Sequence, residues 1–101
     1  KQKPVAKACR AIDGILEEAS EVMGDYKGSP ALDAALIAAA QAVEHYEITR
    51  YGTLKRWAQN LGLSDAVDLL NATLKEESQT DTDLSALADQ IANIKARATV
   101  V

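Results

Sequence analysis

The chain has 101 residues, a net charge of −4 and a hydrophobic content of 48%, with three tyrosines, one tryptophan and no phenylalanine. This length allows one domain at most, over residues 1–101, and the acidic balance offers no basic patch that would favour nucleic acid. No apolar run approaches the roughly 20 residues of a membrane span, and no charged-then-apolar signal segment is present. We therefore expect a soluble, cytoplasmic protein.

The first predicted element is a short helix over residues 5–23, with Gly24 as its stop. Its apolar residues recur at helical spacing: Val5, Ala8, Cys9, Ile12, Ile15, Leu16, Ala19, Val22 and Met23. Cys9 lies on this stripe, and we expect it to be a small buried side chain rather than a reactive thiol. The chain begins KQKP without an initiating Met, which leaves open that it is an internal fragment.

Two long helices follow and form an antiparallel hairpin. The first runs over residues 30–61 and is expected to start at Ser29 as N-cap. Gly62 marks the turn, and Ser64 is expected to cap the third helix, over residues 65–94. No segment predicts a β-strand, so the expected fold class is all-α.

Each long helix carries an apolar stripe that becomes acidic in its middle. Steps of three and four residues define the first stripe: Ile37, Ala40, Glu44, Glu47, Tyr51, Leu54, Ala58 and Leu61. The second stripe consists of Val67, Leu70, Leu74, Glu77, Asp81, Leu84, Ala88 and Ile91. Glu47 lies 15 residues before Gly62 and Glu77 lies 15 after it, so the acidic segments should face each other across the hairpin.

Four carboxylates are thus candidates for one shared site: Glu44, Glu47, Glu77 and Asp81. Burying them without cations would cost several kcal/mol per ion. Neither stripe carries Lys or Arg, and the nearest candidates, Arg50 and Lys75, flank the stripes. The compensation is therefore either water access or a metal ion. Carboxylates on facing helices build metal sites in helical bundles, and such oxygen-rich sites suit iron, manganese or magnesium.

Two residues beside these carboxylates are candidate contacts to the metal ligands. His45 is displaced by about 100° from Glu44, which points it away from the acidic stripe and favours a surface or interface position. Tyr51 follows Glu47 by one turn, so it is either a hydrogen-bond donor to a carboxylate or bound oxygen species, or a plain core residue. Gly52 is expected to let a neighbouring helix approach closely.

Three stretches carry a resemblance to a known family: KPVAKACRAIDGILEEASEV, DAALIAAAQAVEHYEITRYGTLKRWAQNLG and AVDLLNATLKEESQTDTDLSALA. They resemble the C-terminal part of the YciE/YciF group of bacterial stress-associated ferritin-like proteins, over nearly the whole chain. The resemblance implies a ferritin-like four-helix bundle with a carboxylate-bridged metal pair, usually iron. It further implies that Glu44 and Glu47 are ligands from one helix, and Glu77 and Asp81 from the other.

The chain departs from the family pattern in two respects. The family has two further helices upstream that supply the other ligands, and the usual Glu-x-x-His spacing does not occur here. Glu44-x-x-Glu47 and Glu77-x-x-x-Asp81 replace it. This chain is therefore expected to hold at most half a site, completed either by upstream helices or by a second copy in a two-fold dimer.

Two functional interpretations follow from these features. In the first, the chain is a di-metal carboxylate protein that binds iron, or manganese or another divalent metal, and acts in stress protection by oxidising iron or consuming peroxide. In the second, it is a metal-free helical module for dimerisation or assembly, with an acidic core.

Overall fold

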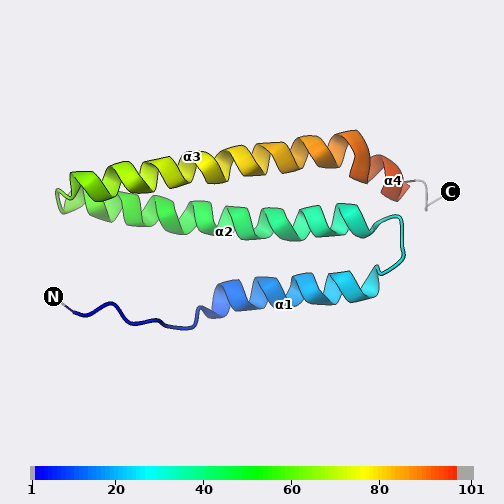
Figure 1. Cartoon of the computed structure of the whole chain (residues 1–101), viewed down its shortest axis with the longest axis horizontal. Coiled ribbons are helices and arrows are strands. Elements are labelled where there is room, and N and C mark those ends of the chain that lie inside the picture. Colours follow the sequence, from blue (N-terminus) through cyan, green and yellow to red (C-terminus); the bar gives the residue numbers. More distant parts are fainter. Residues whose placement is uncertain (1, 98–101) are drawn as a thin grey trace.

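The computed structural model describes residues 2–97 of the chain, and all regular structure in that range is helical. The elements in chain order are α1 (Arg10–Asp25), α2 (Leu32–Asn60), α3 (Ser64–Leu87), a π-helical turn η1 (Ala88–Ala92) and α4 (Asn93–Arg97). The predicted all-α class, with a long hairpin preceded by a shorter helix, is confirmed (Figure 1). None of the helices described is long and apolar enough to cross a membrane.

Helix α1 begins five residues later than the apolar spacing predicted. Cys9 is its N-cap: the backbone there is extended, and the Sγ atom accepts a hydrogen bond from the Ile12 N–H at 3.4 Å. A capping side chain satisfies an N–H that lacks a partner within the helix, so this residue sets the start. Val5, which fits the helical stripe, is instead 82% exposed in the irregular segment before α1.

The turn between α2 and α3 is closed by the backbone around Gly62. The Leu63 N–H donates to the Ala58 carbonyl at 2.9 Å and the Gly62 N–H to the Gln59 carbonyl at 3.1 Å, which is the Schellman pattern. Gly62 has a φ of 71°, a conformation that favours glycine because a Cβ atom is disfavoured there. The turn reverses the chain, so α2 and α3 run antiparallel along most of their length.

The two serines expected as N-caps do not have that role. Helix α2 starts after Ala31, and the Ser29 Oγ accepts a hydrogen bond from the Ala31 N–H at 3.1 Å in the preceding turn. Helix α3 includes Ser64 as its first residue, with Leu63 in the cap position and no side-chain capping bond. Local backbone turns, rather than serine side chains, therefore determine where both long helices begin.

The three long elements lie side by side in one layer, with α2 between α1 and α3 (Figure 1). The shortest dimension of the molecule is 13 Å, close to the diameter of a single helix of about 10–12 Å. The radius of gyration is 17.3 Å, against about 13 Å for a compact domain of this length. Only three hydrophobic residues in the described range are buried: Ile37, Ala58 and Ala92.

The third predicted helix continues past Leu87 but changes its winding. The π-helical turn η1 inserts between α3 and α4, which places Ala92 in a buried position and brings Lys95 to 3.4 Å from Asp33 of α2. The far end of the hairpin is thereby held against the start of α2, while the carboxylate residues lie in the middle of the layer.

Candidate metal centre

Three glutamates from two helices meet in the middle of the hairpin. Glu44 and Glu47 are three residues apart on α2, so they share one face at about 60° from each other. Glu77 of α3 lies opposite them, and each of the three side chains offers a carboxylate oxygen within 4.8 Å of the other two. All three residues are half-buried. The matching depth predicted by counting from Gly62 therefore brings these side chains together.

The glutamate cluster, defined as Glu44, Glu47 and Glu77, has no cation paired with it in the described part of the chain. The Oε2 atom of Glu44 is buried and makes no hydrogen bond. Arg50, one of the two flanking cations, instead lies with its guanidinium 5.3 Å from the centre of the Tyr46 ring. A buried carboxylate oxygen without a donor is costly, since its solvation by water is lost without replacement.

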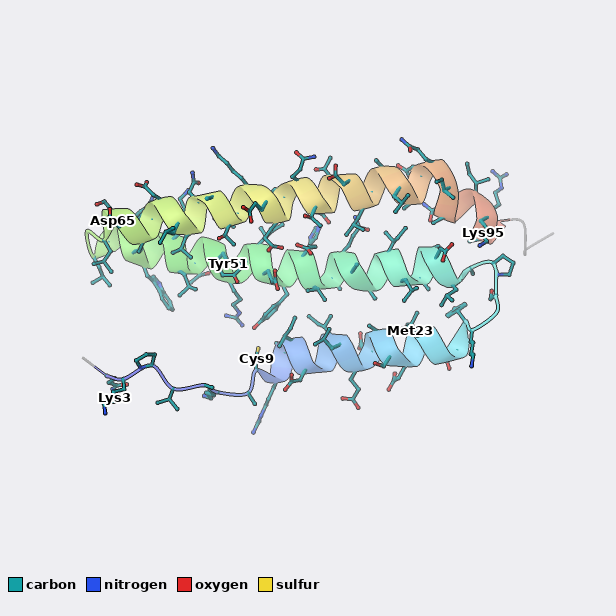
Figure 2. The ribbon with its side chains drawn as sticks, viewed as in Figure 1. Lys3, Cys9, Met23, Tyr51, Asp65 and Lys95 are labelled. Atoms are coloured by element: carbon teal, nitrogen blue, oxygen red, sulfur yellow. The ribbon has the colours of Figure 1, made fainter. Side chains whose placement is uncertain are left out.

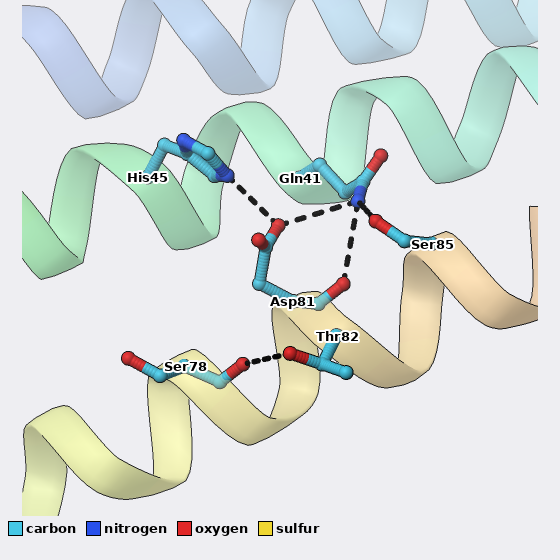
Figure 3. Close-up of polar contacts among 6 residues, drawn as sticks. All are labelled: Gln41, His45, Ser78, Asp81, Thr82 and Ser85. Carbon is cyan, nitrogen blue, oxygen red and sulfur yellow. Dashed lines mark hydrogen bonds and ion pairs between the residues drawn. The ribbon is translucent and has the colours of Figure 1, made fainter.

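Asp81, the fourth predicted ligand, is not part of this cluster. Its Oδ1 atom lies 2.9 Å from the His45 Nε2 and accepts a hydrogen bond from the Gln41 Nε2 at 3.3 Å (Figure 3). Asp81 follows Glu77 by four residues, which moves it about 6 Å along α3 and about 40° around it. This displacement carries its carboxylate from the cluster to the side of the hairpin where His45 and Gln41 project.

The prediction that His45 points away from the acidic residues was wrong in one respect. Its side chain is 67% exposed, as a surface histidine would be, yet it reaches across to Asp81 of α3. The displacement of about 100° separates His45 only from the glutamates of its own helix. Asp81 is itself rotated by about 40° from Glu77 on α3, so its carboxylate lies within reach of the His45 ring.

Gln41 makes polar contacts to α3 that the sequence analysis did not predict. Its Nε2 atom donates to the Ser85 Oγ at 2.8 Å and lies 3.3 Å from both the backbone carbonyl and the Oδ1 of Asp81 (Figure 3). The sequence does contain a pattern that indicates these contacts: Gln41 precedes His45 by four residues, and Ser85 follows Asp81 by four. Such pairs lie on one helix face and can meet a matching pair on an antiparallel neighbour.

Tyr46, rather than Tyr51, makes a hydrogen bond through its hydroxyl, and it does so toward α1 rather than toward the cluster between α2 and α3. The Tyr51 hydroxyl has no hydrogen-bond partner among residues 2–97, and its predicted contact to the ligands stays a prediction. The Tyr46 hydroxyl lies 3.0 Å from the Cys9 Sγ, which stands at the start of α1 beside the middle of α2 (Figure 2).

Cys9 is more than the small buried side chain that we expected. It is half-buried, caps α1 and bonds to α2. The hydrogen bond with Tyr46, and to a smaller extent that with the Ile12 N–H, lowers the pKa of the Cys9 thiol, because both bonds favour the thiolate.

The donor set of the glutamate cluster fits a hard metal ion. Three carboxylates supply oxygen ligands without nitrogen or sulfur, a combination that suits magnesium, manganese and iron rather than soft metals. A cation between them would neutralise like charges at close range and give the buried Oε2 of Glu44 a partner. On both grounds, the residues present fit a bound metal.

Comparison with known proteins places the chain in a family. A family model described as a domain of unknown function, DUF892, matches residues 1–97. The chain belongs to the DUF892 family. It is 51% identical over 88 residues to Protein YciF of Escherichia coli K12, an alignment that covers 87% of this chain and 53% of YciF. The resemblance of the sequence to the YciE/YciF group is thereby confirmed.

Two solved structures share the fold of this DUF892 chain. The crystal structure of the E. coli stress protein YciF matches with a TM-score of 0.84 and 48% identity, over 90% of this chain and 57% of that one. YcfI from Rhodopseudomonas palustris, for which a structural role is suggested, matches with a TM-score of 0.77 and 51% identity, over 83% and 54%. The chain thus spans about half the length of these relatives.

Proposed function

We propose that this chain binds a metal ion through Glu44, Glu47 and Glu77, as part of a ferritin-like di-metal carboxylate protein. The observation that carries the proposal is the convergence of three carboxylates within 4.8 Å, one of which has a buried oxygen without a hydrogen bond. Three like charges so close together repel each other by roughly 1 kcal/mol per pair even in water, and by more at a half-buried site. A cation removes that repulsion.

Iron is the proposed metal, with manganese or another hard divalent ion as its substitute. The all-oxygen ligand set favours such ions, and a bound iron would supply one-electron redox chemistry toward oxygen or peroxide. The glutamates would hold the ion and keep its surroundings anionic, which favours the higher oxidation state. E. coli YciF is described as a stress protein, and we extend a stress-protective role to this chain on that similarity.

Three glutamates from one hairpin leave part of an ion's coordination shell to other donors. Iron and manganese in oxygen-rich sites prefer six ligands. We propose that a second copy of the chain, related by a two-fold axis, or the further length present in the relatives, brings the remaining ligands. The single-layer shape supports this, because both broad faces of α2 and α3 lack a covering helix within residues 2–97.

Metal content after dialysis tests the proposal. Wild-type protein equilibrated with Fe(II) under anaerobic conditions, or with Mn(II), should retain metal after exhaustive dialysis. Glu47→Gln should retain much less. Glu76→Gln, which removes an equal charge from the exposed residue beside Glu77, should retain as much as the wild type. Equal retention by Glu47→Gln and wild type would contradict coordination by the cluster.

A second function is favoured by a separate observation. Twelve large hydrophobic side chains in the described range are exposed, whereas only three hydrophobic residues are buried. Leu54 and Trp57 are among the exposed ones and share one face of α2, and Leu61, the C-cap residue of α2, follows Trp57 by one turn. The alternative is therefore a metal-free dimerisation or assembly module. Dimerisation that is unaffected by EDTA, in a protein that retains no metal, would favour this alternative.

A further inference from the structure

Four polar side chains form a bridge between the two long helices, next to the glutamate cluster. Gln41 and His45 come from α2, and Asp81 and Ser85 from α3; we refer to these four residues as the polar clamp (Figure 3). Its three shortest side-chain contacts are 2.8 Å from Gln41 to Ser85, 2.9 Å from His45 to Asp81 and 3.3 Å from Gln41 to Asp81. Together they join two successive turns of each helix.

A second polar contact joins the same helices on the other side of the glutamates. The Lys55 Nζ donates to the Asn71 Oδ1 at 2.9 Å. Lys55 follows His45 by ten residues on α2, and Asn71 precedes Asp81 by ten residues on α3. The two contacts therefore belong to one antiparallel register. Glu47 and Glu77 lie between them, whereas Glu44 lies between Gln41 and His45, within the span of the clamp.

Apolar packing alone gives this register little support. Among the described residues of α2 and α3, only two hydrophobic side chains are buried. They are Ile37 and Ala58, and both belong to the α2 stripe. Small alanines on a helix surface allow a neighbouring helix to slide, because few large side chains interlock. Directional hydrogen bonds at two successive turns resist such sliding.

The position of Glu77 depends on that register. A slip of α3 by one residue would move the Glu77 backbone by about 1.5 Å and, to keep a similar helix face inward, would require a rotation of about 100°. Either change would take the carboxylate away from Glu44 and Glu47. The polar clamp is one turn of α3 from Glu77, so it acts close to the residue that it would hold.

We propose that Gln41 and Asp81 are positioning residues that fix the register of α3 on α2 and so bring Glu77 to Glu44 and Glu47. Asp81 is then not a metal ligand, because its carboxylate bonds to Gln41 and His45 and lies outside the group of three glutamate oxygens. The consequence for metal affinity rests on the proposed function, whereas the consequence for the register does not.

Three substitutions separate positioning from coordination. Asp81→Ala and Gln41→Met each remove contacts of the clamp, whereas Asp81→Asn keeps an oxygen that can accept from Gln41 and His45. In Mn(II) titrations followed by electron paramagnetic resonance, Asp81→Ala and Gln41→Met should weaken binding about tenfold, as loss of a group that orients a ligand does. Asp81→Asn should retain near-wild-type affinity. A loss in Asp81→Asn as large as that in Glu77→Gln would overturn the proposal, since it would make Asp81 a ligand.

Hydrogen–deuterium exchange of the metal-free protein provides a readout that does not depend on metal. Backbone amides of α3 around Glu77 and Asp81 should exchange faster in Asp81→Ala and Gln41→Met than in Asp81→Asn or wild type. If wild type binds no Mn(II), the proposed metal function fails, and exchange alone decides whether the clamp fixes the register. Exchange in Asp81→Ala and Gln41→Met that matches wild type would overturn the proposal. Glu76→Gln serves as the control for a simple loss of charge on α3.

Discussion

Glu47 of α2 and Glu77 of α3 approach each other across the hairpin, with carboxylate oxygens less than 4.8 Å apart and no Lys or Arg paired to either in the described range. Such an arrangement destabilises the protein when no cation is bound and favours any state in which one is. Stability without metal and affinity for metal should therefore respond in opposite directions to the same substitution.

Glu77→Gln is the substitution that tests this opposition. In the presence of EDTA it should raise the melting temperature by about 4 °C, equivalent to roughly 1 kcal/mol, because it removes one of three like charges. With Mn(II) or Fe(II) it should lower the gain in melting temperature that the metal gives wild type. Differential scanning calorimetry of both proteins measures the two effects.

The exposed neighbour Glu76 provides the control for this experiment. Glu76→Gln removes the same charge from the same turn of α3 but not from the cluster. It should leave both melting temperatures nearly unchanged. Equal shifts of Glu77→Gln with and without metal would show that Glu77 does not coordinate.

The sequence predicted the hairpin and the glutamate cluster because both depend on helical periodicity. Glu44, Glu47 and Glu77 follow from steps of three and four residues and from equal counts on either side of Gly62. The position of the Asp81 carboxylate could not be predicted in the same way. A residue four positions after Glu77 is also rotated by about 40° around the helix axis, so its contacts depend on which side chains of α2 are near it. In the structure those side chains are Gln41 and His45.

The ends of the helices were predicted less well, for a related reason. Cys9 is not among the preferred capping residues, so the delayed start of α1 had no clear signal in the sequence. The π-helical turn at Ala88–Ala92 lies within an uninterrupted helical pattern, and its position follows from packing against α2 rather than from local residue preference.

Tyr46→Phe should make the Cys9 thiol less reactive. The Tyr46 hydroxyl lowers the pKa of the thiol, so removing it raises that pKa toward the ordinary value and reduces the thiolate fraction at a given pH. Alkylation of Cys9 by iodoacetamide near pH 7.5 should slow several-fold. The pH at which the rate reaches half its maximum should move upward.

The matching control for this measurement is Tyr51→Phe. Tyr51 makes no hydrogen bond to Cys9 in the described structure, so its substitution should leave the alkylation profile as in wild type. A Tyr46→Phe profile that coincides with wild type at every pH would contradict the role of the Tyr46 hydroxyl.

Gly52→Ala should stabilise the monomeric chain. Nothing lies within 4 Å of the point where a Cβ atom would stand, so the close approach of a helix expected at Gly52 does not occur within the described structure. Replacing glycine by alanine inside a helix should then add about 0.5–1 kcal/mol. Chemical denaturation measures the change.

Gly14 in α1 is the matched site for comparison, because its Cβ position is also open. Both alanine variants should stabilise the protein by similar amounts. If Gly14→Ala stabilises and Gly52→Ala destabilises, a partner helix approaches Gly52 in solution, and the monomer is not the species being unfolded.

Trp57, the single tryptophan of the chain, reports on association. It is 59% exposed and lies on a face of α2 that continues, one turn later, to the C-cap residue Leu61. If two copies pair through this face, its fluorescence emission should shift to shorter wavelength as the protein concentration rises, and sedimentation velocity should show a dimer over the same range. Leu61→Lys should move both transitions to higher concentration.

Substitution of an exposed hydrophobic residue on another helix distinguishes association through this face of α2 from nonspecific hydrophobic association. Leu16→Lys in α1 should leave the Trp57 emission transition in place. A constant emission wavelength together with a monomer at all concentrations would contradict a dimer formed through α2.

The location of a bound metal tests the central claim most directly. Crystals of the chain grown with Mn(II) should give an anomalous difference peak about 2.0–2.3 Å from carboxylate oxygens of Glu44, Glu47 and Glu77, with Asp81 still bonded to His45 and Gln41. A map in which the three glutamates surround no anomalous peak, although manganese is bound elsewhere on the protein, would contradict the account.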